Sequence, residues 1–213
     1  KISLDIDHEK KKLTINQIDR TGRVVISGKI IDSWKIIFIG DESNKIKSVN
    51  KNYENLTGCL TFVDVVLKNV SLSAQNSNCE DSINLIRSKG NIANIIIRNS
   101  KYDGIDADFS SLEIKDLKIE NSGNDCLDFS FGQYKIENID LKQCGDKGIS
   151  VGEKSNAYFN NVKIKETNIG IASKDSSFVE ANNVNIKDSE TCVSAYKKKQ
   201  EFNFANIKIE NII

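Results

Sequence analysis

Several features that often mark a function are missing from this sequence of 213 residues. Its 30 basic residues balance 30 acidic ones, so no overall field is available to hold nucleic acid or an anionic membrane. Its apolar runs fall far short of the roughly 18 residues that span a bilayer, and no signal-like segment opens the chain. We therefore expect no nucleic-acid partner and no membrane insertion, and any electrostatic function must be local.

Residue types that support familiar chemistries are scarce as well. The single histidine, His8, argues against a Ser-His-Asp hydrolase, and no two cysteines have the CxxC spacing of a zinc site. Methionine and proline are absent and the sequence starts at Lys1, which suggests a processed product or a piece of a longer chain with further domains.

An internal repeat of 22 residues is the strongest pattern that is present. Within each repeat apolar and polar residues alternate, as in "LEIKDLKIEN", which indicates short strands and argues against helices. Such strands bury their inward side chains only if successive turns stack on one another. The aliphatic residues that recur at this spacing are Ile83, Ile105, Leu127, Ile149, Ile171 and Val193.

The repeat predicts an all-β fold, a right-handed parallel β-helix with rungs of about 22 residues. The hand follows because parallel crossover connections are overwhelmingly right-handed. A leucine-rich repeat has a similar length, but its fixed pattern of leucine and asparagine is not found. We expect the regular coil over 58–213, and over 1–57 a cap or irregular first turns whose strands do not fall into register.

Stacking brings together acidic residues that are scattered along the chain. Residues one repeat apart become neighbours about 4.8 Å apart, so Asp106 and Asp128 should lie one above the other on the outer surface. A second column, close to a bend, should contain Asp103, Asp125 and Lys147. The acids expected on three adjacent rungs are Asp81, Asp103, Asp106, Asp108, Asp125 and Asp128.

Unit charges at about 5 Å repel by roughly 3 kcal/mol, which raises the pKa of one carboxyl unless something compensates. The compensation could be a shared proton, a cation such as Lys147, or calcium held by Asp81, Asp103 and Asp125. A shared proton is what a general acid needs. Alternatively, aspartate is favoured at bends because it bonds nearby backbone, without any chemistry. The candidate catalytic residues are Asp103, Asp125, Asp106, Asp128 and Lys147.

Three stretches, "YDGID" at 102–106, "NDC" at 124–126 and "GDKGISVG" at 145–152, resemble the ordered motifs of polygalacturonases, which degrade pectin on a right-handed β-helix. The resemblance implies that Asp103 and Asp125 are the acid and the base. In the third motif this sequence departs from the family, because Asp146 and Lys147 stand where the family has a histidine between glycines.

Two further stretches, "GDKGISVGEKS" and "GIASKDSS", resemble β-helix modules of large bacterial proteins in the pectin-lyase-like superfamily. This likeness implies the fold and a secreted or cell-surface location. The stretch "AYKKKQEF" at 195–202 is either a solvated loop or part of a binding surface. In the second case Lys174, Tyr196 and Lys197 would hold an anionic sugar above the acids, and Asp108 and Asp146 complete the expected substrate-binding residues.

The five cysteines are expected to be free. Cys126 and Cys192 share a column but lie three turns apart, beyond bridging distance, and Cys79 and Cys144 are about as distant. Only Cys59 and Cys79 fall on adjacent turns, with an offset along the strand. Free buried thiols fit a reducing compartment.

The sequence leaves two functions open. One is a carbohydrate-active domain that binds or cleaves a polysaccharide, as a glycoside hydrolase or as a lyase-like enzyme in which Lys147 or Lys174 is the base. The other is a non-catalytic adhesion or scaffold module of a larger bacterial protein, whose acids bind calcium or solvate bends. For a hydrolase, carboxylates about 5 Å apart predict retention of stereochemistry, and a wider spacing predicts inversion.

Overall fold

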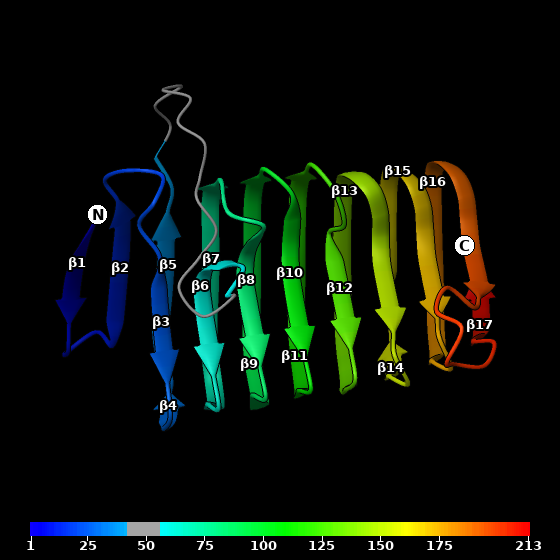
Figure 1. Ribbon diagram of the computed structural model, residues 1–213, viewed down its shortest axis with the longest axis horizontal. Coiled ribbons are helices and arrows are strands. Elements are labelled where there is room, and N and C mark those ends of the chain that lie inside the picture. Colours follow the sequence, from blue (N-terminus) through cyan, green and yellow to red (C-terminus); the bar gives the residue numbers. More distant parts are fainter. Residues whose placement is uncertain (42–55) are drawn as a thin grey trace.

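In the computed structural model, which describes residues 1–41 and 56–213, the chain is a parallel β-solenoid of about eight turns (Figure 1). The all-β fold and its rungs of about 22 residues are therefore confirmed. The described residues include no helix that is long and apolar enough to cross a membrane. The strands are β1 (Ile2–Asp7), β2 (Lys12–Gln17), β3 (Val24–Ser27), β4 (Ile30–Asp32), β5 (Lys35–Ile39), β6 (Gly58–Val63), β7 (Val66–Ser77), β8 (Asp81–Ile86), β9 (Lys89–Ser100), β10 (Asp103–Asp108), β11 (Ser111–Ser122), β12 (Leu127–Ser130), β13 (Gln133–Gly152), β14 (Asn156–Phe159), β15 (Val162–Lys174), β16 (Phe178–Tyr196) and β17 (Asn206–Ile212).

The turns of the coil stack into three parallel faces, which we call A, B and C. Face A consists of β3, β6, β8, β10, β12 and the final parts of β13, β15 and β16. Face B includes β4, β14 and the first parts of β7, β9, β11 and β13, and face C includes β2 and β5. Long strands such as β13 bend through the corners and contribute to all three faces.

The interior of the coil is filled by the aliphatic columns. Ile105 pairs with Ile83 below it and with Leu127 above it, as the repeat predicts, and all three are fully buried. Removing these side chains from water is the main source of stability of the coil. Val193 belongs to the same column but is 39% exposed, because it lies in the last strand of face A.

Asparagine ladders hold the corner between faces C and A. Asn99 Nδ2 donates to Asn76 Oδ1 at 2.9 Å, and Asn121 Nδ2 donates to Asn99 Oδ1 at 3.0 Å. The three residues have φ values of 55°, 57° and 64°, in the left-handed region that asparagine tolerates better than most residues. Asparagine suits this corner because its backbone tolerates a positive φ and because its side chain can both donate and accept a hydrogen bond in the ladder.

Asn99→Ala is expected to lower the free energy of unfolding by about 1–2 kcal/mol, because it removes two side-chain hydrogen bonds and strains a positive φ. Asn99→Gly relieves the strain and still breaks the ladder, so it should cost less than the alanine variant. Urea denaturation of both variants measures the difference. Equal stability of the alanine variant and the wild type would contradict this account.

The amino-terminal strands fall into register with the coil, which was not expected from the sequence. Strands β3, β4 and β5 pair in parallel with β6 and β7, so stacking on face A starts at Val24 and not near residue 58. The period is hidden because Ile26 pairs with Phe62, whereas the next step, from Phe62 to Leu85, has the usual length. Among the strands of residues 1–41 and 56–213, only β1 departs from the coil, since it pairs antiparallel with β2.

The prediction that the cysteines are free is wrong for four of the five. Disulfides join Cys59 to Cys79 and Cys126 to Cys144, each with 5.4 Å between the Cα atoms, while Cys192 is free and exposed. The sequence argument noted that Cys59 and Cys79 fall on adjacent turns but counted their offset against a bond, and it did not compare Cys126 with Cys144; both pairs lie diagonally across the corner between faces C and A.

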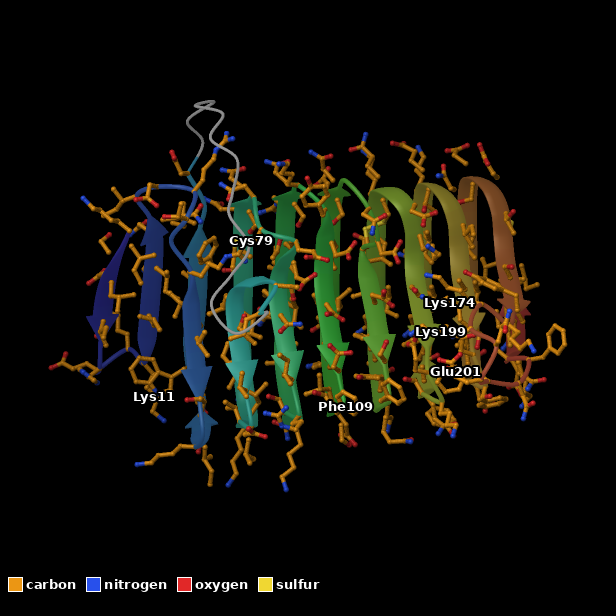
Figure 2. All side chains as sticks on the ribbon, viewed as in Figure 1. Lys11, Cys79, Phe109, Lys174, Lys199 and Glu201 are labelled. Carbon is orange, nitrogen blue, oxygen red and sulfur yellow. A yellow bond between two sulfur atoms is a disulfide. The ribbon has the colours of Figure 1, made fainter. Side chains whose placement is uncertain are left out.

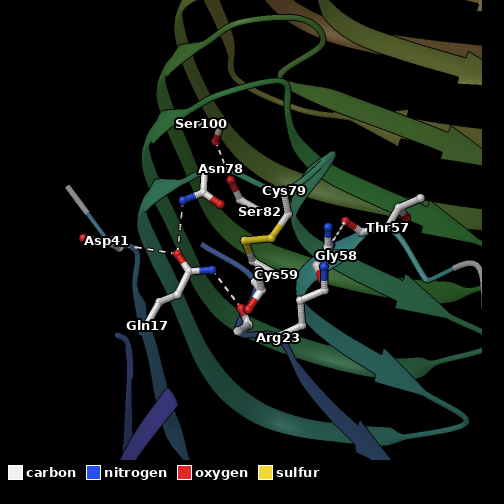
Figure 3. Close-up of a disulfide and its surroundings, with 12 residues drawn as sticks. Gln17, Arg23, Asp41, Thr57, Gly58, Cys59, Asn78, Cys79, Ser82 and Ser100 are labelled. Atoms are coloured by element: carbon white, nitrogen blue, oxygen red, sulfur yellow. Dashed lines mark hydrogen bonds between the residues drawn. A yellow bond between two sulfur atoms is a disulfide. The ribbon is translucent and has the colours of Figure 1, made fainter. Parts of the chain in front are cut away.

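The neighbourhood of the first disulfide shows how this corner is tied to the start of the coil (Figure 3). Gln17 Oε1 accepts hydrogen bonds from the Asp41 backbone and from Asn78 Nδ2, beside Cys79. The Arg23 guanidinium donates to the carbonyl oxygens of Thr57 and Gly58, beside Cys59. The first turns are therefore joined covalently and by hydrogen bonds to the turns that follow.

Candidate functional site

The acidic residues that were predicted to stack do so on the outer surface of face A. Asp106 pairs with Asn84 below it and with Asp128 above it, and Asp108 pairs with Ser130. Strand alternation turns these side chains outward, because the neighbouring aliphatic residues of the same strands are buried. We call Asp106, Asp108 and Asp128 the acid cluster.

Asp106 keeps its proton at neutral pH. Burial raises the pKa of Asp106 to about 10, and the charges of Asp81, Asp108, Asp128 and Asp103 add to the effect. Its Oδ2 atom accepts a hydrogen bond of 3.0 Å from Asn84 Nδ2. The proton is shared with Asp108, since a hydrogen bond between the two carboxyls opposes the burial that raises the pKa of Asp108.

Asp128 forms an ion pair with a buried lysine. Lys174 Nζ lies 3.6 Å from Asp128 Oδ1, and the Lys174 side chain is only 6% exposed against 29% for Asp128. The acid cluster therefore contains two of the compensations that the sequence suggested, a shared proton and a buried lysine. A protonated acid and a solvent-accessible carboxylate on adjacent rungs can support acid–base chemistry.

The corner acids Asp103 and Asp125 also lie together, as predicted, but their carboxylates accept hydrogen bonds from backbone N–H groups. Asp103 Oδ1 accepts hydrogen bonds of 2.7 Å from the Asp125 N–H and from Asn124 Nδ2. Asp125 Oδ1 accepts the N–H of Lys147 at 3.0 Å, one turn further on. The bend interpretation therefore accounts for these two residues.

Burial dominates the electrostatics of the corner. It raises the pKa of Asp125 to about 6, partly offset by Lys147, whose Nζ atom is 3.4 Å from Asp125 Oδ1. Burial also raises the pKa of Asp81 to about 7. Lys147 contacts Asp146 as well, so its charge is shared between two carboxylates. The three residues Asp125, Asp146 and Lys147 thus form a closed ionic group.

The carboxyl-terminal segment 197–204, which we call the strap, folds back over the edge of face A. The backbone N–H groups of Lys198 and Lys199 both donate to Asp175 Oδ1 at 2.7 Å. Lys199 Nζ lies 2.6 Å from Glu153 Oε1, and Glu153 Oε2 accepts a hydrogen bond from the Ser130 hydroxyl. Lys174 and Lys199 are both labelled in the carboxyl-terminal half of the coil in Figure 2.

Sequence reasoning missed Glu153 and Asp175, which hold the strap. Both have positive φ values at turns, where the strand pattern carries no signal, and their partners belong to a later turn. Of the expected sugar-binding residues, Lys174 and Tyr196 do pair in register, and Lys197 is exposed. Lys174 is nevertheless occupied by Asp128 and is buried, so it is not free for an anionic sugar.

The calcium hypothesis for Asp81, Asp103 and Asp125 gains no geometric support. Within residues 1–41 and 56–213, no three histidine, cysteine or acidic side chains are grouped so that they could hold a metal ion. The Oδ1 atoms of Asp103 and Asp125 already accept hydrogen bonds from the chain itself.

Comparison with known proteins identifies the family. A family model described as a right-handed beta helix region matches residues 61–209, which is more than half of the chain. The chain belongs to this family of right-handed β-helices, and the predicted hand is confirmed. No curated protein and no solved structure matches the chain.

Proposed function

We propose that the protein is a carbohydrate-active β-helix that binds a polysaccharide on face A and cleaves its glycosidic bonds with the acid cluster. The observation that carries this proposal is the register pairing of Asp106 with Asp128 on adjacent rungs. Asp106 holds a proton at neutral pH, while Asp128 lies one turn away beside Lys174. Most glycosidases use two carboxyl groups, one as the general acid and the other as the nucleophile or base.

The spacing of the two residues favours a retaining mechanism. Stacked neighbours lie about 5 Å apart, within the range for retaining enzymes. Asp106 would give its proton to the glycosidic oxygen while Asp128 attacks the anomeric carbon and forms a glycosyl ester. Water would then hydrolyse the ester, with its proton returning to Asp106 and Asp128 leaving as a carboxylate.

The test is the release of reducing ends from a panel of polysaccharides. Asp106→Asn and Asp128→Asn are each expected to lower the rate by about 100-fold or more, because each removes one chemical role. Asp140→Asn is the matched control, since Asp140 is exposed on face C, where it forms an ion pair with Lys118. Activity of both cluster variants at the wild-type level, or wild-type inactivity on every substrate, would contradict the proposal.

The second candidate is a non-catalytic module of a larger protein. It is favoured by the corner acids Asp103 and Asp125, whose carboxylates are already used to order the backbone. In that case the protein binds a glycan without releasing reducing ends or unsaturated products. In either case the two disulfides support a secreted or cell-surface location, because such bonds persist in oxidising compartments.

A further inference from the structure

We propose that the acid cluster binds the ammonium group of an amino sugar, so that the polysaccharide is a polymer of hexosamines with free amino groups. This inference rests on the proposed function and names the substrate class of the same site. It concerns binding, and can therefore be tested apart from cleavage.

Unpartnered buried acceptors surround the acid cluster. Asn84 is 1% exposed, and its Nδ2 atom donates to Asp106, yet its Oδ1 atom has no hydrogen-bond partner among the residues that the structure describes. The Oγ atom of Ser150, which pairs with Asp128 one turn above, is likewise buried without a hydrogen-bond partner in the described part of the chain, whereas Asp128 Oδ1 makes no hydrogen bond there but lies 3.6 Å from Lys174 Nζ. A buried polar atom without a hydrogen bond destabilises the folded protein, and the Oδ1 atoms of Asn84 and Asp128 can accept a hydrogen bond but cannot donate one. A ligand for this surface must bring donors.

The charges near the cluster exclude an acidic sugar. Lys174 is engaged by Asp128, and Lys199 by Glu153. Lys147 is shared between Asp125 and Asp146. A uronate carboxylate would therefore meet acidic side chains whose neighbouring lysines are already paired, and the like charges would repel. An anionic substrate, which was expected from the lysines around Lys174, is not supported by these contacts.

An ammonium group fits better than a hydroxyl group or a metal ion. It offers three donors and a positive charge, so it can satisfy unmet acceptors and also relieve the repulsion among the carboxyls. A sugar hydroxyl supplies a donor but no charge. A divalent metal needs several convergent acidic ligands, and the residues that the structure describes provide no such group.

Binding of a cation has a second signature, the release of protons. Burial and neighbouring carboxylates hold the pKa values of Asp106 and Asp108 above the usual range in the free protein. An ammonium group beside them lowers both pKa values, so binding is coupled to proton release from the acid cluster, while a pKa of about 10 in the free protein lets Asp106 keep the proton that it donates in cleavage. Non-specific adsorption of a polycation elsewhere on the surface does not have this effect, because exposed carboxylates there are already ionised.

The experiment is isothermal titration calorimetry with a short glucosamine oligomer, in two buffers that differ in ionisation enthalpy. The matched ligands are the fully N-acetylated oligomer, a galacturonate oligomer and an oligolysine. We expect the glucosamine oligomer to bind about ten- to hundredfold more tightly than the N-acetylated one, with proton release, and the galacturonate not to bind. Asp108→Asn should weaken binding by about tenfold, and Asp140→Asn should not.

Equal affinity for the acetylated, acidic or oligolysine ligand would overturn the inference, as would unchanged binding to Asp108→Asn. These failures can be told apart from failure of the proposed function. If a neutral polysaccharide is cleaved while glucosamine oligomers do not bind, the substrate class is wrong and the cleavage proposal stands. If glucosamine oligomers bind with proton release but are never cleaved, the binding site stands and the hydrolase does not.

Discussion

Replacing Cys126 and Cys144 together by alanine lowers the free energy of unfolding by about 2–5 kcal/mol. The disulfide closes a loop with a sequence separation of 18 and joins two adjacent turns, and both cysteines are buried. Without it the unfolded chain gains conformational freedom, and the alanine side chains leave a void at the corner. Urea denaturation under non-reducing conditions measures the loss.

Two other positions serve as controls for the disulfide variant. Cys192→Ala should leave stability unchanged within about 0.5 kcal/mol, because this cysteine is free and exposed. Ser82 and Ser100 occupy the equivalent corner two turns earlier, where their Oγ atoms are 2.6 Å apart, so Ser100→Ala removes only a hydrogen bond at the same kind of position. A Cys126 and Cys144 double variant as stable as Cys192→Ala would disprove the structural role of the disulfide.

Stability of the wild-type protein is expected to fall as the pH rises from about 4 towards 10. The pKa of Asp106 is 3.8 in the reference state and about 10 in the folded protein, so between these values the folded state holds a proton that the unfolded state has lost. Each such group lowers the free energy of unfolding by on the order of 1.4 kcal/mol per pH unit. Asp125 and Asp81, with pKa values of about 6 and 7, act in the same direction over narrower ranges.

Asp106→Asn should therefore stabilise the protein, by on the order of 6 kcal/mol at pH 8, and have little effect near pH 4. The amide keeps the shape and a donor for Asp108 but carries no charge that must be neutralised. Thermal unfolding at both pH values measures this difference, with Asp140→Asn as the control. A wild type that is more stable at pH 9 than at pH 5 would rule out the explanation. A variant that gains stability and loses activity is the expected signature of a functional acid.

The repeat alone located the acid cluster, because a strict spacing on a stacked coil converts sequence positions into neighbours. Asp106 and Asp128 pair in register as the period of 22 requires, and Lys174 and Tyr196 follow the same rule. Protonation states could not be obtained in this way. They depend on burial and on the ion pair between Asp128 and Lys174, which come from different turns.

Features at the corners were not accessible from the period. Cys126 and Cys144 belong to different columns that meet only where the chain turns from face C to face A, so a column-by-column comparison missed them. The register of β3, β4 and β5 was hidden because the step from Ile26 to Phe62 is longer than the others. Glu153 and Asp175 became visible only through the strap, whose path no repeat predicts.

The disulfides between adjacent turns also govern how the coil responds to mechanical load. Each turn of a solenoid contacts only its neighbours, so a chain pulled at its two ends should peel away one turn after another. The bonds from Cys59 to Cys79 and from Cys126 to Cys144 block this peeling at two places, because the segments that they enclose cannot lengthen under force. The contour length released in a single-molecule stretching experiment should thus increase by two discrete steps when a reductant is added.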